Sequence, residues 1–278
     1  MRAAPVRVSP PTACNRRRRY AGRAVIDLHS HILPGLDDGP ENVDESVAMA
    51  RSMAEDGICI VAATPHVRND YPTTPAEMEE ALQLVRGAVA SAGIDIDVRP
   101  GGEIALDELA GLDRETLMRF GLGGNSRALL LEYPYSGWPL GLVPVCMRLR
   151  QDGIVPVVAH PERNREIQRS PSDLEPLVEA GAVVQLTAAS VDGRLGRAAA
   201  ACARRLLELD LAHLIASDAH SSGVREAGLS NAAQVLGGRA LARWLTSDVP
   251  EAILSGDDLP ARPMGPRRRS GFLGRIRS

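Results

Sequence analysis

Residues Val25–Pro40 read V-I-D-L-H-S-H-I-L-P-G-L-D-D-G-P, a short apolar segment that runs into a turn rich in proline and glycine. The apolar pattern is typical of a buried strand. His29 and His31 are two positions apart, so in a strand both side chains point to the same side. Asp37 and Asp38 add carboxylate oxygens in the loop that follows. This grouping predicts the mouth of a metal site at the end of the first strand.

Segments of strand length alternate with segments of helical periodicity along the rest of the chain. Asn42 is a predicted helix N-cap, Thr74 with Glu77 forms a predicted capping box, and Ser172 with Glu175 is predicted to cap a later helix. The expected strands are the apolar runs at 25–28, 58–63, 94–98, 128–131, 154–159, 182–186 and 213–216. The expected helices follow them at about 43–56, 75–92, 142–152, 172–180, 196–210, 227–236, 239–245 and 250–254.

Seven short strands alternating with helices favour parallel βα units in a single domain. Because no linker-like segment interrupts residues 24–261, a closed or nearly closed sheet is favoured over two domains. We therefore predict a distorted (β/α)7 barrel of the TIM-like kind. An open doubly wound sheet is the alternative, since periodicity alone does not distinguish the two.

Composition places the chain among soluble globular proteins. Of its 278 residues, 44% are hydrophobic and 24% are charged, which is ordinary for such a protein. No apolar run approaches the roughly 18 residues of a membrane span. The N-terminus is rich in Arg and Pro and lacks the apolar core of a secretory signal peptide. A cytoplasmic protein is therefore expected.

Positive charge is concentrated at the two ends of the chain. Residues 1–23 carry seven Arg and no acid, and residues 262–278 carry six Arg and no acid, so residues 24–261 hold a formal charge of −16. We expect a disordered basic N-terminal extension (1–23), a central domain (24–261) and a basic C-terminal tail (262–278). Solvation is the simpler interpretation of such tails. Attraction to an anionic membrane or to an acidic partner is the alternative.

Residues that can bind metal recur where the predicted strands end. In a (β/α) barrel, functional side chains gather at the C-terminal ends of the strands. Taken singly, each residue has an ordinary explanation as a core histidine, a helix cap or a solvated loop residue. Their joint placement predicts a multinuclear metal site, and only His213 lies at the start of a strand, where a structural role is expected. The candidate ligands at these strand ends are His29, His31, His66, Glu103, Glu132, His160, Asp218 and His220, and Asp37 and Asp38 are further candidates in the loop after the first strand.

The run from Ile26 to Pro40 resembles the first motif of the polymerase and histidinol phosphatase (PHP) superfamily. More narrowly, it resembles the bacterial CpsB/CapC/YwqE-type protein-tyrosine phosphatases of capsule and exopolysaccharide systems. The resemblance covers about residues 25–258. Later motifs of the family are matched in order by A-T-P-H (63–66), G-G-E-I (101–104), L-L-E-Y-P (130–134), A-H-P-E-R (159–163), S-D-A-H (217–220) and V-P-E-A-I-L-S-G (249–256).

This resemblance implies three divalent metal ions at the mouth of the barrel. The implied sets are His29, His31, Glu103 and Asp218 for the first ion; Glu103 as a bridge with Glu132 and His160 for the second; and Asp38, His66 and His220 for the third. Mixed imidazole and carboxylate ligands suit Mn²⁺, Fe²⁺, Co²⁺ or Zn²⁺. The family favours Mn²⁺.

Three further residues receive roles in catalysis. The resemblance assigns Arg163 and Arg225 to phosphate oxygens, although on sequence alone each is one of 32 arginines. Asp37 is expected to hydrogen-bond a ligand and is, with a metal-bound water, a candidate general acid. For Asp27, a hydrogen bond to a ligand and a structural role at the strand end are equally expected. A phosphomonoester carries up to two negative charges near pH 7, which complements a site holding three divalent ions and four carboxylates.

A cysteine nucleophile is excluded by the sequence. Tyrosine phosphatases of that class require Arg six residues after the catalytic Cys. The residues at that position after Cys14, Cys59, Cys146 and Cys202 are Tyr20, Pro65, Asp152 and Glu208. None of the four is Arg, so a thiol-based mechanism cannot operate here.

The resemblance implies that a metal-bridging water hydrolyses phosphotyrosine on a bacterial tyrosine kinase that regulates capsule or exopolysaccharide synthesis. The first alternative is a PHP-type small-molecule phosphatase, for example for histidinol phosphate, or a phosphodiesterase. A metal-stabilised module that docks on the kinase without catalysis is a third. Nucleic-acid binding is disfavoured, because the body is acidic and the chain has only two Trp, four Tyr and two Phe for base stacking.

Overall fold

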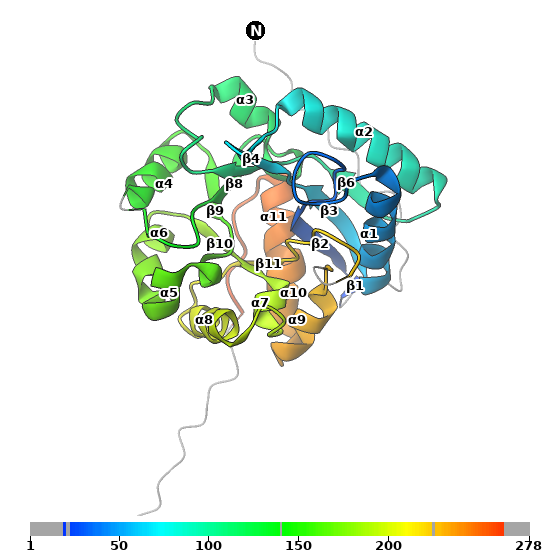
Figure 1. Cartoon of the computed structure of the whole chain (residues 1–278). Coiled ribbons are helices and arrows are strands. Elements are labelled where there is room, and N and C mark those ends of the chain that lie inside the picture. The colour runs from blue at the N-terminus through cyan, green and yellow to red at the C-terminus, as the bar shows by residue number, and fades with distance from the viewer. Residues whose placement is uncertain (1–18, 21–22, 140, 224–225, 264–278) are drawn as a thin grey trace, which may run out of the picture.

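The computed structural model describes residues 19–20, 23–139, 141–223 and 226–263. Within these ranges the chain forms curled β-sheets with helices on the outside (Figure 1). None of the described helices has both the length and the apolar character needed to cross a membrane.

The strands form two sheets. One has four strands in the order β1-β2-β3-β6, and the other has seven in the order β11-β10-β9-β8-β7-β4-β5. Neighbouring strands are parallel, except that β1 pairs antiparallel with β2 and β4 pairs antiparallel with β5. The strands are β1 (Arg19–Tyr20), β2 (Arg23–Ser30), β3 (Ile58–Ala63), β4 (His66–Arg68), β5 (Tyr71–Pro72), β6 (Asp97–Arg99), β7 (Glu103–Ala105), β8 (Ala128–Glu132), β9 (Val155–Val158), β10 (Val183–Thr187) and β11 (Leu214–Ala216).

The predicted α/β architecture with parallel strands is confirmed, as a mixed α/β fold with a curled seven-stranded sheet. The exact number of seven βα units in one barrel is not confirmed. Thr64 and Pro65 separate β3 from β4, and residues 100–102 separate β6 from β7. Proline supplies no N–H to a ladder, so each of these two chain segments leaves one sheet and joins the other. A parallel bridge between Ser30 and Ala219 links β2 to the segment after β11.

The first two helices begin and end where the sequence predicts. In α1 (Val43–Asp56), the Asn42 side chain accepts a hydrogen bond from the Glu45 N–H at 3.1 Å, and Gly57 ends the helix with φ 98°. In α2 (Pro75–Ser91), the capping box of Thr74 and Glu77 is present in both directions. Such caps satisfy N–H groups that the first turn leaves without partners.

Two local predictions are wrong. Residues Ile94–Ile96, expected to open a strand, instead close α2: the Ile94 N–H donates to the Val89 carbonyl at 3.1 Å, as in a Schellman-type helix end. Ser172 does not cap a helix. A 3-10 turn over Pro171–Leu174 precedes α6 (Glu175–Glu179), and the Ser170 hydroxyl donates to Asp173 at 2.7 Å.

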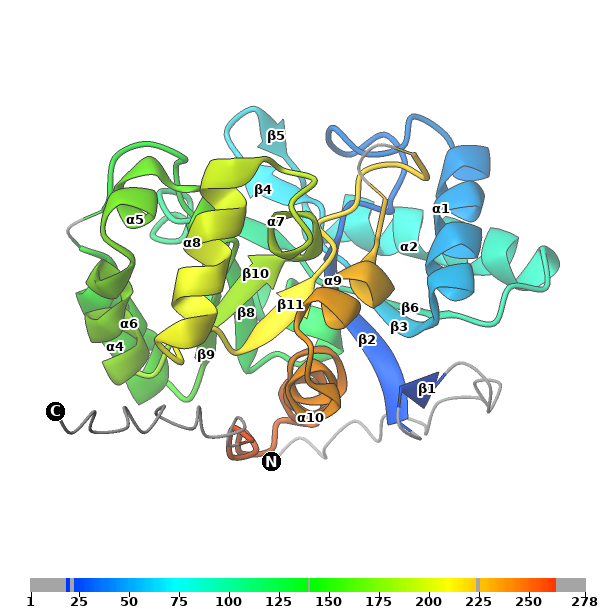
Figure 2. The same ribbon diagram turned by 90° about the horizontal axis from the view of Figure 1, so that it is seen from below.

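Most of the remaining helices lie around the sheets, whereas α11 lies in the middle of the view in Figure 1 (Figures 1 and 2). The β4–β5 hairpin and the loop after β2 lie at one end of the sheets, and α10 lies at the other (Figure 2). The other helical segments are α3 (Arg114–Arg119), η2 (Leu122–Gly124), α4 (Leu142–Gln151), η3 (Pro161–Arg163), α5 (Arg165–Arg169), α7 (Ala188–Val191), α8 (Arg197–Glu208), α9 (Leu229–Val235), α10 (Arg239–Arg243), the π-helical η5 (Trp244–Asp248) and α11 (Val249–Ser255).

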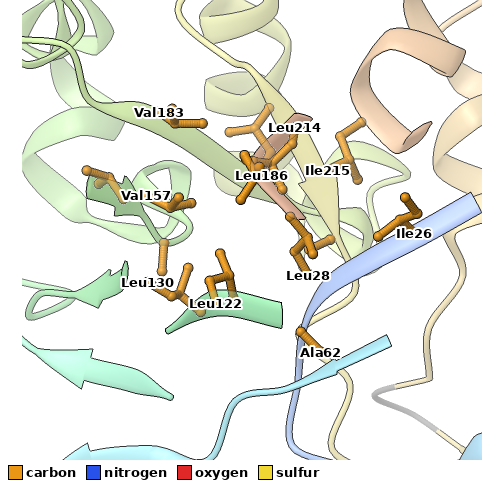
Figure 3. Packing of buried hydrophobic residues seen from close by; sticks show 14 of the residues in the cluster. Ile26, Leu28, Ala62, Leu122, Leu130, Val157, Val183, Leu186, Leu214 and Ile215 are labelled. Atoms are coloured by element: carbon orange, nitrogen blue, oxygen red, sulfur yellow. The ribbon is translucent and has the colours of Figure 1, made fainter. Parts of the chain in front are cut away.

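The core lies between the strands and extends under the helices. Leu28, Leu130, Leu186 and Ile215 come from four different strands and belong to one buried cluster (Figure 3), and each is at most 1% exposed. Close packing of this kind is sensitive to added atoms. The core therefore provides a rigid base for the polar residues at the strand ends.

Gly102 shows how closely the core approaches the polar end of the molecule. A Cβ at this position would lie 2.6 Å from Cδ1 of the fully buried Phe120. Only glycine allows this approach of backbone and ring. The contact places the next residue, Glu103, at the start of β7.

His213 has the structural role that the sequence predicts for the start of a strand. Its Nδ1 accepts a hydrogen bond from the Val184 N–H at 3.1 Å, so that nitrogen carries no proton. Burial, together with the positive charge of Arg262, lowers the pKa of His213 to about 4.

We expect stability to fall as pH falls from 6.5 towards 4, because the unfolded chain takes up a proton on His213 in this window and the folded chain does not. Neutral His213 makes its full contribution to the free energy of unfolding above pH 6.5. This contribution amounts to at most about 3 kcal/mol. Urea unfolding at a series of pH values would measure it. The variant His213→Gln keeps an acceptor for Val184 and should show a flatter profile. Equal pH slopes in both proteins would place the titrating group elsewhere.

Some described residues lie beyond both predicted boundaries of the central domain. β1 precedes residue 24 and pairs with β2, Arg19 opposite Ala24. At the other end, Arg262 donates to the carbonyl oxygens of Ala212 at 2.7 Å and Leu207 at 2.9 Å. The rest of the two basic extensions lies outside the described residues. Net charge alone could not reveal that one arginine of the C-terminal run would hydrogen-bond the body.

Candidate metal centre

The first strand and its loop bring four polar side chains to one end of the sheets. His29 lies in β2 and His31 directly follows it, and both are fully buried. Gly35 takes the left-handed conformation with φ 71°, and its N–H donates to the Pro40 carbonyl at 2.8 Å. This turn is one that glycine adopts without strain. It returns the loop, with its two aspartates, towards β4.

Glu103 lies at the centre of the cluster and is fully buried. Its Oε2 is 2.9 Å from His66 Nδ1 and 3.3 Å from both His29 Nε2 and His31 Nε2. Its Oε1 is 2.9 Å from His160 Nε2. One carboxylate therefore contacts four imidazoles from three separate chain segments, an arrangement compatible with the bridging role that the resemblance implies.

Asp218 closes the same group from the end of β11. Its Oδ1 lies 3.5 Å from His29 Nε2 and 3.4 Å from His31 Nε2. Asp218 and His160 have positive φ values of 52° and 34°. Left-handed backbone is uncommon for residues other than glycine and costs of the order of 1 kcal/mol or more. The strain falls on two predicted ligands, as is usual for residues held in place for function.

A second group forms around Asp38 and His66. Asp38 Oδ1 is 3.1 Å from His220 Nε2 and 3.5 Å from His66 Nε2. On the other side of the same ring, His66 Nδ1 is 3.4 Å from Glu132 Oε2. The imidazole of His66 therefore lies between Asp38 and the two buried glutamates.

The structure brings all nine predicted ligands together in four overlapping groups that could each hold a metal ion. These groups are His31, Asp38, His66 and His220; His29, His31 and Glu103; His29, His160 and Asp218; and His66, Glu103 and Glu132. The first contains the whole set implied for the third ion. The set implied for the second ion is divided, because Glu103 and Glu132 group with His66 while His160 groups with His29 and Asp218.

The chemistry of this cluster fits divalent metal ions. Glu103 Oε2 and His66 Nδ1 are buried and form no hydrogen bond within the described part of the chain, although they lie 2.9 Å apart. Burial disfavours a charged His66, yet the carboxylates of Asp38, Glu103 and Glu132 raise its pKa to about 11. The site thus attracts positive charge strongly. Imidazole with carboxylate is a donor set for transition-metal ions.

A cavity of about 210 Å³ opens beside the cluster. Arg163 reaches it from η3, and its Nη1 is 2.5 Å from Asp218 Oδ2. The Arg163 guanidinium also lies 4.5 Å from the centre of the Tyr135 ring. The lining residues are Asp38, His66, Arg68, Tyr135, His160, Arg163, Asp218 and His220.

Comparison with known proteins assigns the family. The profile of the family described as "Capsular polysaccharide synthesis, CpsB/CapC" matches residues 25–255. The chain belongs to the CpsB/CapC family. It is 35% identical over 255 residues to tyrosine-protein phosphatase YwqE of Bacillus subtilis (strain 168), covering 90% of this chain and 99% of YwqE. It is 29% identical over 245 residues to tyrosine-protein phosphatase CpsB of Streptococcus pneumoniae, covering 83% and 98%.

Solved structures agree with this assignment. A crystal structure from work on YwqE and CpsB, described there as metal-dependent tyrosine phosphatases, matches with a TM-score of 0.77 and 33% identity, over 87% of this chain and 100% of that one. A β-aspartyl dipeptidase from Fervidobacterium islandicum matches with a TM-score of 0.51 and 16% identity. The second match shows only that the fold is shared.

Asp37 contacts two of the predicted ligands of this CpsB/CapC site, His31 and His66. Its Oδ2 is 2.6 Å from His31 Nδ1 and accepts a hydrogen bond from the His66 N–H at 3.0 Å. Asp37 does not line the cavity, so the geometry favours the predicted hydrogen bond to a ligand and gives no support to a general acid. Asp27 Oδ1 accepts from the N–H groups of His29 at 3.2 Å and Ser217 at 2.9 Å. Asp37 therefore contacts the ring of the predicted ligand His31, whereas Asp27 holds the backbone at the strand end, as a structural role would require.

Sequence reasoning missed polar residues of the site, among them Gln185 and Arg68. Gln185 Oε1 is 3.0 Å from His29 Nδ1, and the signal was a single polar residue inside the apolar strand V-V-Q-L-T. Arg68 lines the cavity from β4, and nothing in its sequence context distinguished it from other arginines. Arg225, predicted to bind phosphate, lies outside the described residues.

Proposed function

We propose that this protein is a metal-dependent protein-tyrosine phosphatase that hydrolyses phosphotyrosine on a bacterial tyrosine kinase of capsule or exopolysaccharide synthesis. One observation carries the proposal: the Glu103-centred cluster of buried ligands lies beside a cavity lined by arginine and tyrosine side chains. The relatives YwqE and CpsB, which match this chain over nearly all of their length, are named tyrosine-protein phosphatases.

The proposed cofactor is three divalent ions, Mn²⁺ in the first place, with Fe²⁺, Co²⁺ or Zn²⁺ as the other ions that this donor set suits. Nine residues would hold them: His29, His31, Asp38, His66, Glu103, Glu132, His160, Asp218 and His220. When bound, such ions would lower the pKa of a water and stabilise charge on phosphoryl oxygens. We also propose that the two sheets together form the distorted (β/α)7 barrel of this domain.

The residues of the cavity are suited to a phosphate monoester of an aromatic alcohol. Arg163 presents planar N–H donors that match two phosphoryl oxygens, and Asp218 holds that guanidinium in place through the contact described above. The ring of Tyr135 lies beside the guanidinium at the cavity and offers an apolar face to an aryl group. A phenolate leaves with a pKa near 10, so the reaction depends less on a general acid than release of an alkoxide does.

The described free cysteines take no part in this chemistry. Cys146 and Cys202 are buried and lie outside the cavity. Burial raises the pKa of the Cys146 thiol to about 11 and that of Cys202 to about 12. Neither forms the thiolate that a cysteine nucleophile requires.

The proposal is tested by turnover of a phosphotyrosine peptide compared with histidinol phosphate and a nucleotide diester, each with Mn²⁺ supplied. We expect the phosphopeptide to have the highest kcat/KM. A preference for histidinol phosphate would indicate a small-molecule phosphatase instead. Absence of hydrolysis with Mn²⁺, Co²⁺ and Fe²⁺ would leave a metal-stabilised binding module.

Replacing Arg163 by Ala should raise KM or lower kcat for a phosphotyrosine peptide, because a charge-assisted hydrogen-bond donor to phosphate is lost. We expect kcat/KM to fall roughly 10- to 100-fold. Metal content per chain should stay at the wild-type value, since Arg163 is not a ligand. Steady-state kinetics and elemental analysis of the same preparation measure both. Loss of metal in Arg163→Ala would show that its main task is to hold Asp218.

A further inference from the structure

The β4–β5 hairpin carries a second arginine into the cavity, from a different part of the chain than Arg163. We propose that Arg68 is a second substrate-binding residue, which donates to the phosphoryl oxygens together with Arg163. This inference rests on the proposed phosphatase function and adds a residue to it. It gives the site two guanidinium groups within the described part of the chain.

Arg68 is held in the cavity by three neighbours. Its Nε is 2.8 Å from Asp70 Oδ1, its Nη1 is 3.2 Å from Glu132 Oε2, and its guanidinium carbon lies 5.2 Å from the centre of the Tyr71 ring. The Tyr71 ring in turn stacks on the predicted ligand His66, with ring centres 5.7 Å apart. A two-residue turn joins β4 to β5, so Arg68 and Tyr71 face each other directly across the hairpin.

Arg163 has two contacts of the same kind on its own side, a carboxylate and a tyrosine ring. Each guanidinium reaches a buried carboxylate that is a predicted ligand, Glu132 for Arg68 and Asp218 for Arg163. Each also lies over a tyrosine ring, at 5.2 Å for Arg68 and 4.5 Å for Arg163. The side chains are 28% and 20% exposed. Both are therefore partly desolvated, in a place where a charged hydrogen bond is stronger than at the open surface.

Each arginine keeps donors available to a ligand. A guanidinium has five N–H groups, and the hydrogen bonds above use Nη1 of Arg68 and Nη1 of Arg163. Nε of Arg68 is in the ion pair with Asp70 and forms no hydrogen bond within the described residues. Within the described residues, neither Nη2 group donates a hydrogen bond to the protein. Phosphate has more acceptor oxygens than one arginine can satisfy. A dianion entering the cavity would meet N–H groups from two directions.

The competing role for Arg68 is purely structural, namely to hold Glu132. The two roles predict different measurements. A residue that binds phosphate affects KM and the inhibition constant of inorganic phosphate and leaves bound metal unchanged. A residue that only positions Glu132 affects metal content first and has no effect of its own on phosphate binding.

The test compares Arg68→Ala and Arg68→Lys with the wild type on a phosphotyrosine peptide and with inorganic phosphate as inhibitor. For Arg68→Ala we expect kcat/KM to fall roughly 10- to 100-fold and phosphate inhibition to weaken by a similar factor, with unchanged metal per chain. Arg68→Lys should recover only part of the loss, because lysine keeps the charge but not the planar fork. Tyr71→Leu should weaken phosphate inhibition by roughly two- to five-fold through loss of the cation–π contact.

Arg119→Ala is the matched control, because Arg119 is an ion-paired arginine, bonded to Glu79 at 2.7 Å, that does not line the cavity. It should behave as the wild type. Unchanged phosphate inhibition in Arg68→Ala would overturn the inference while leaving the phosphatase function intact, and so would a loss of metal in Arg68→Ala. If the wild type itself does not hydrolyse the phosphopeptide, the proposed phosphatase function is contradicted. Direct titration of phosphate into the metal-loaded proteins still tests Arg68 in that case.

Discussion

His29→Ala and Asp218→Ala are each expected to abolish hydrolysis of a phosphotyrosine peptide and to reduce the metal bound per chain. His29 Nε2 lies within 3.5 Å of both Glu103 and Asp218, so its loss opens the group that is implied to hold the first ion. Asp218 contacts the same histidines and the Arg163 guanidinium. We expect kcat/KM to fall at least about 1000-fold, on the order of 4 kcal/mol of transition-state stabilisation.

Elemental analysis measures the metal bound per chain and steady-state kinetics measure kcat/KM on the same preparation. Circular dichroism establishes that the variants fold. Asp107→Ala is a suitable control, since Asp107 is an exposed acid in the loop after β7. Full activity in either site variant would contradict the proposed centre. Lost activity with unchanged metal in His29→Ala would instead assign this histidine to the reaction itself.

The positions of the predicted ligands followed from the sequence, because a strand end has a recognisable form. Short apolar runs such as I-C-I-V-A-A stop at a polar residue or a proline, and the structure places β3 on this run without change. In parallel βα units these ends meet on one face. His66 and Glu103 are neighbours in register on β4 and β7, although 37 positions separate them in the sequence. Periodicity therefore sufficed to group the ligands.

Which of the nine predicted ligands lie next to one another could not be predicted from sequence. The implied sets join Glu132 with His160 and stay predictions, while Glu132 Oε2 also lies 3.4 Å from His66 Nδ1, a neighbour that the sets do not include. This choice depends on side-chain rotamers and on the break between β3 and β4, which periodicity does not encode. Gln185 and Arg68 were missed for a related reason, because their roles depend on what lies across the sheet or hairpin and not on their own sequence context.

Glu103→Gln should show how far metal binding depends on the negative charge of the Glu103 carboxylate and not on the size of the side chain. The amide keeps the size of the side chain and one acceptor oxygen, but it removes the negative charge that four imidazoles share. A neutral amide is a much poorer ligand for a divalent ion than a carboxylate is. Because Glu103 is implied to bridge two ions, we expect metal content to fall by more than one ion per chain and kcat/KM to fall at least about 1000-fold.

The structure predicts a second effect of the same substitution, on stability in the metal-loaded state. Ions that bind only the folded chain stabilise it by mass action, so the wild type should gain thermal stability when Mn²⁺ is added and Glu103→Gln should gain much less. Glu80→Gln, at an exposed position of α2, should respond as the wild type does. If Glu103→Gln keeps its full response to Mn²⁺ and loses only activity, Glu103 acts on the substrate or on a proton. In that case the bridge must be assigned to another carboxylate of the cluster, for which Asp218, in contact with both His29 and His31, is the next choice.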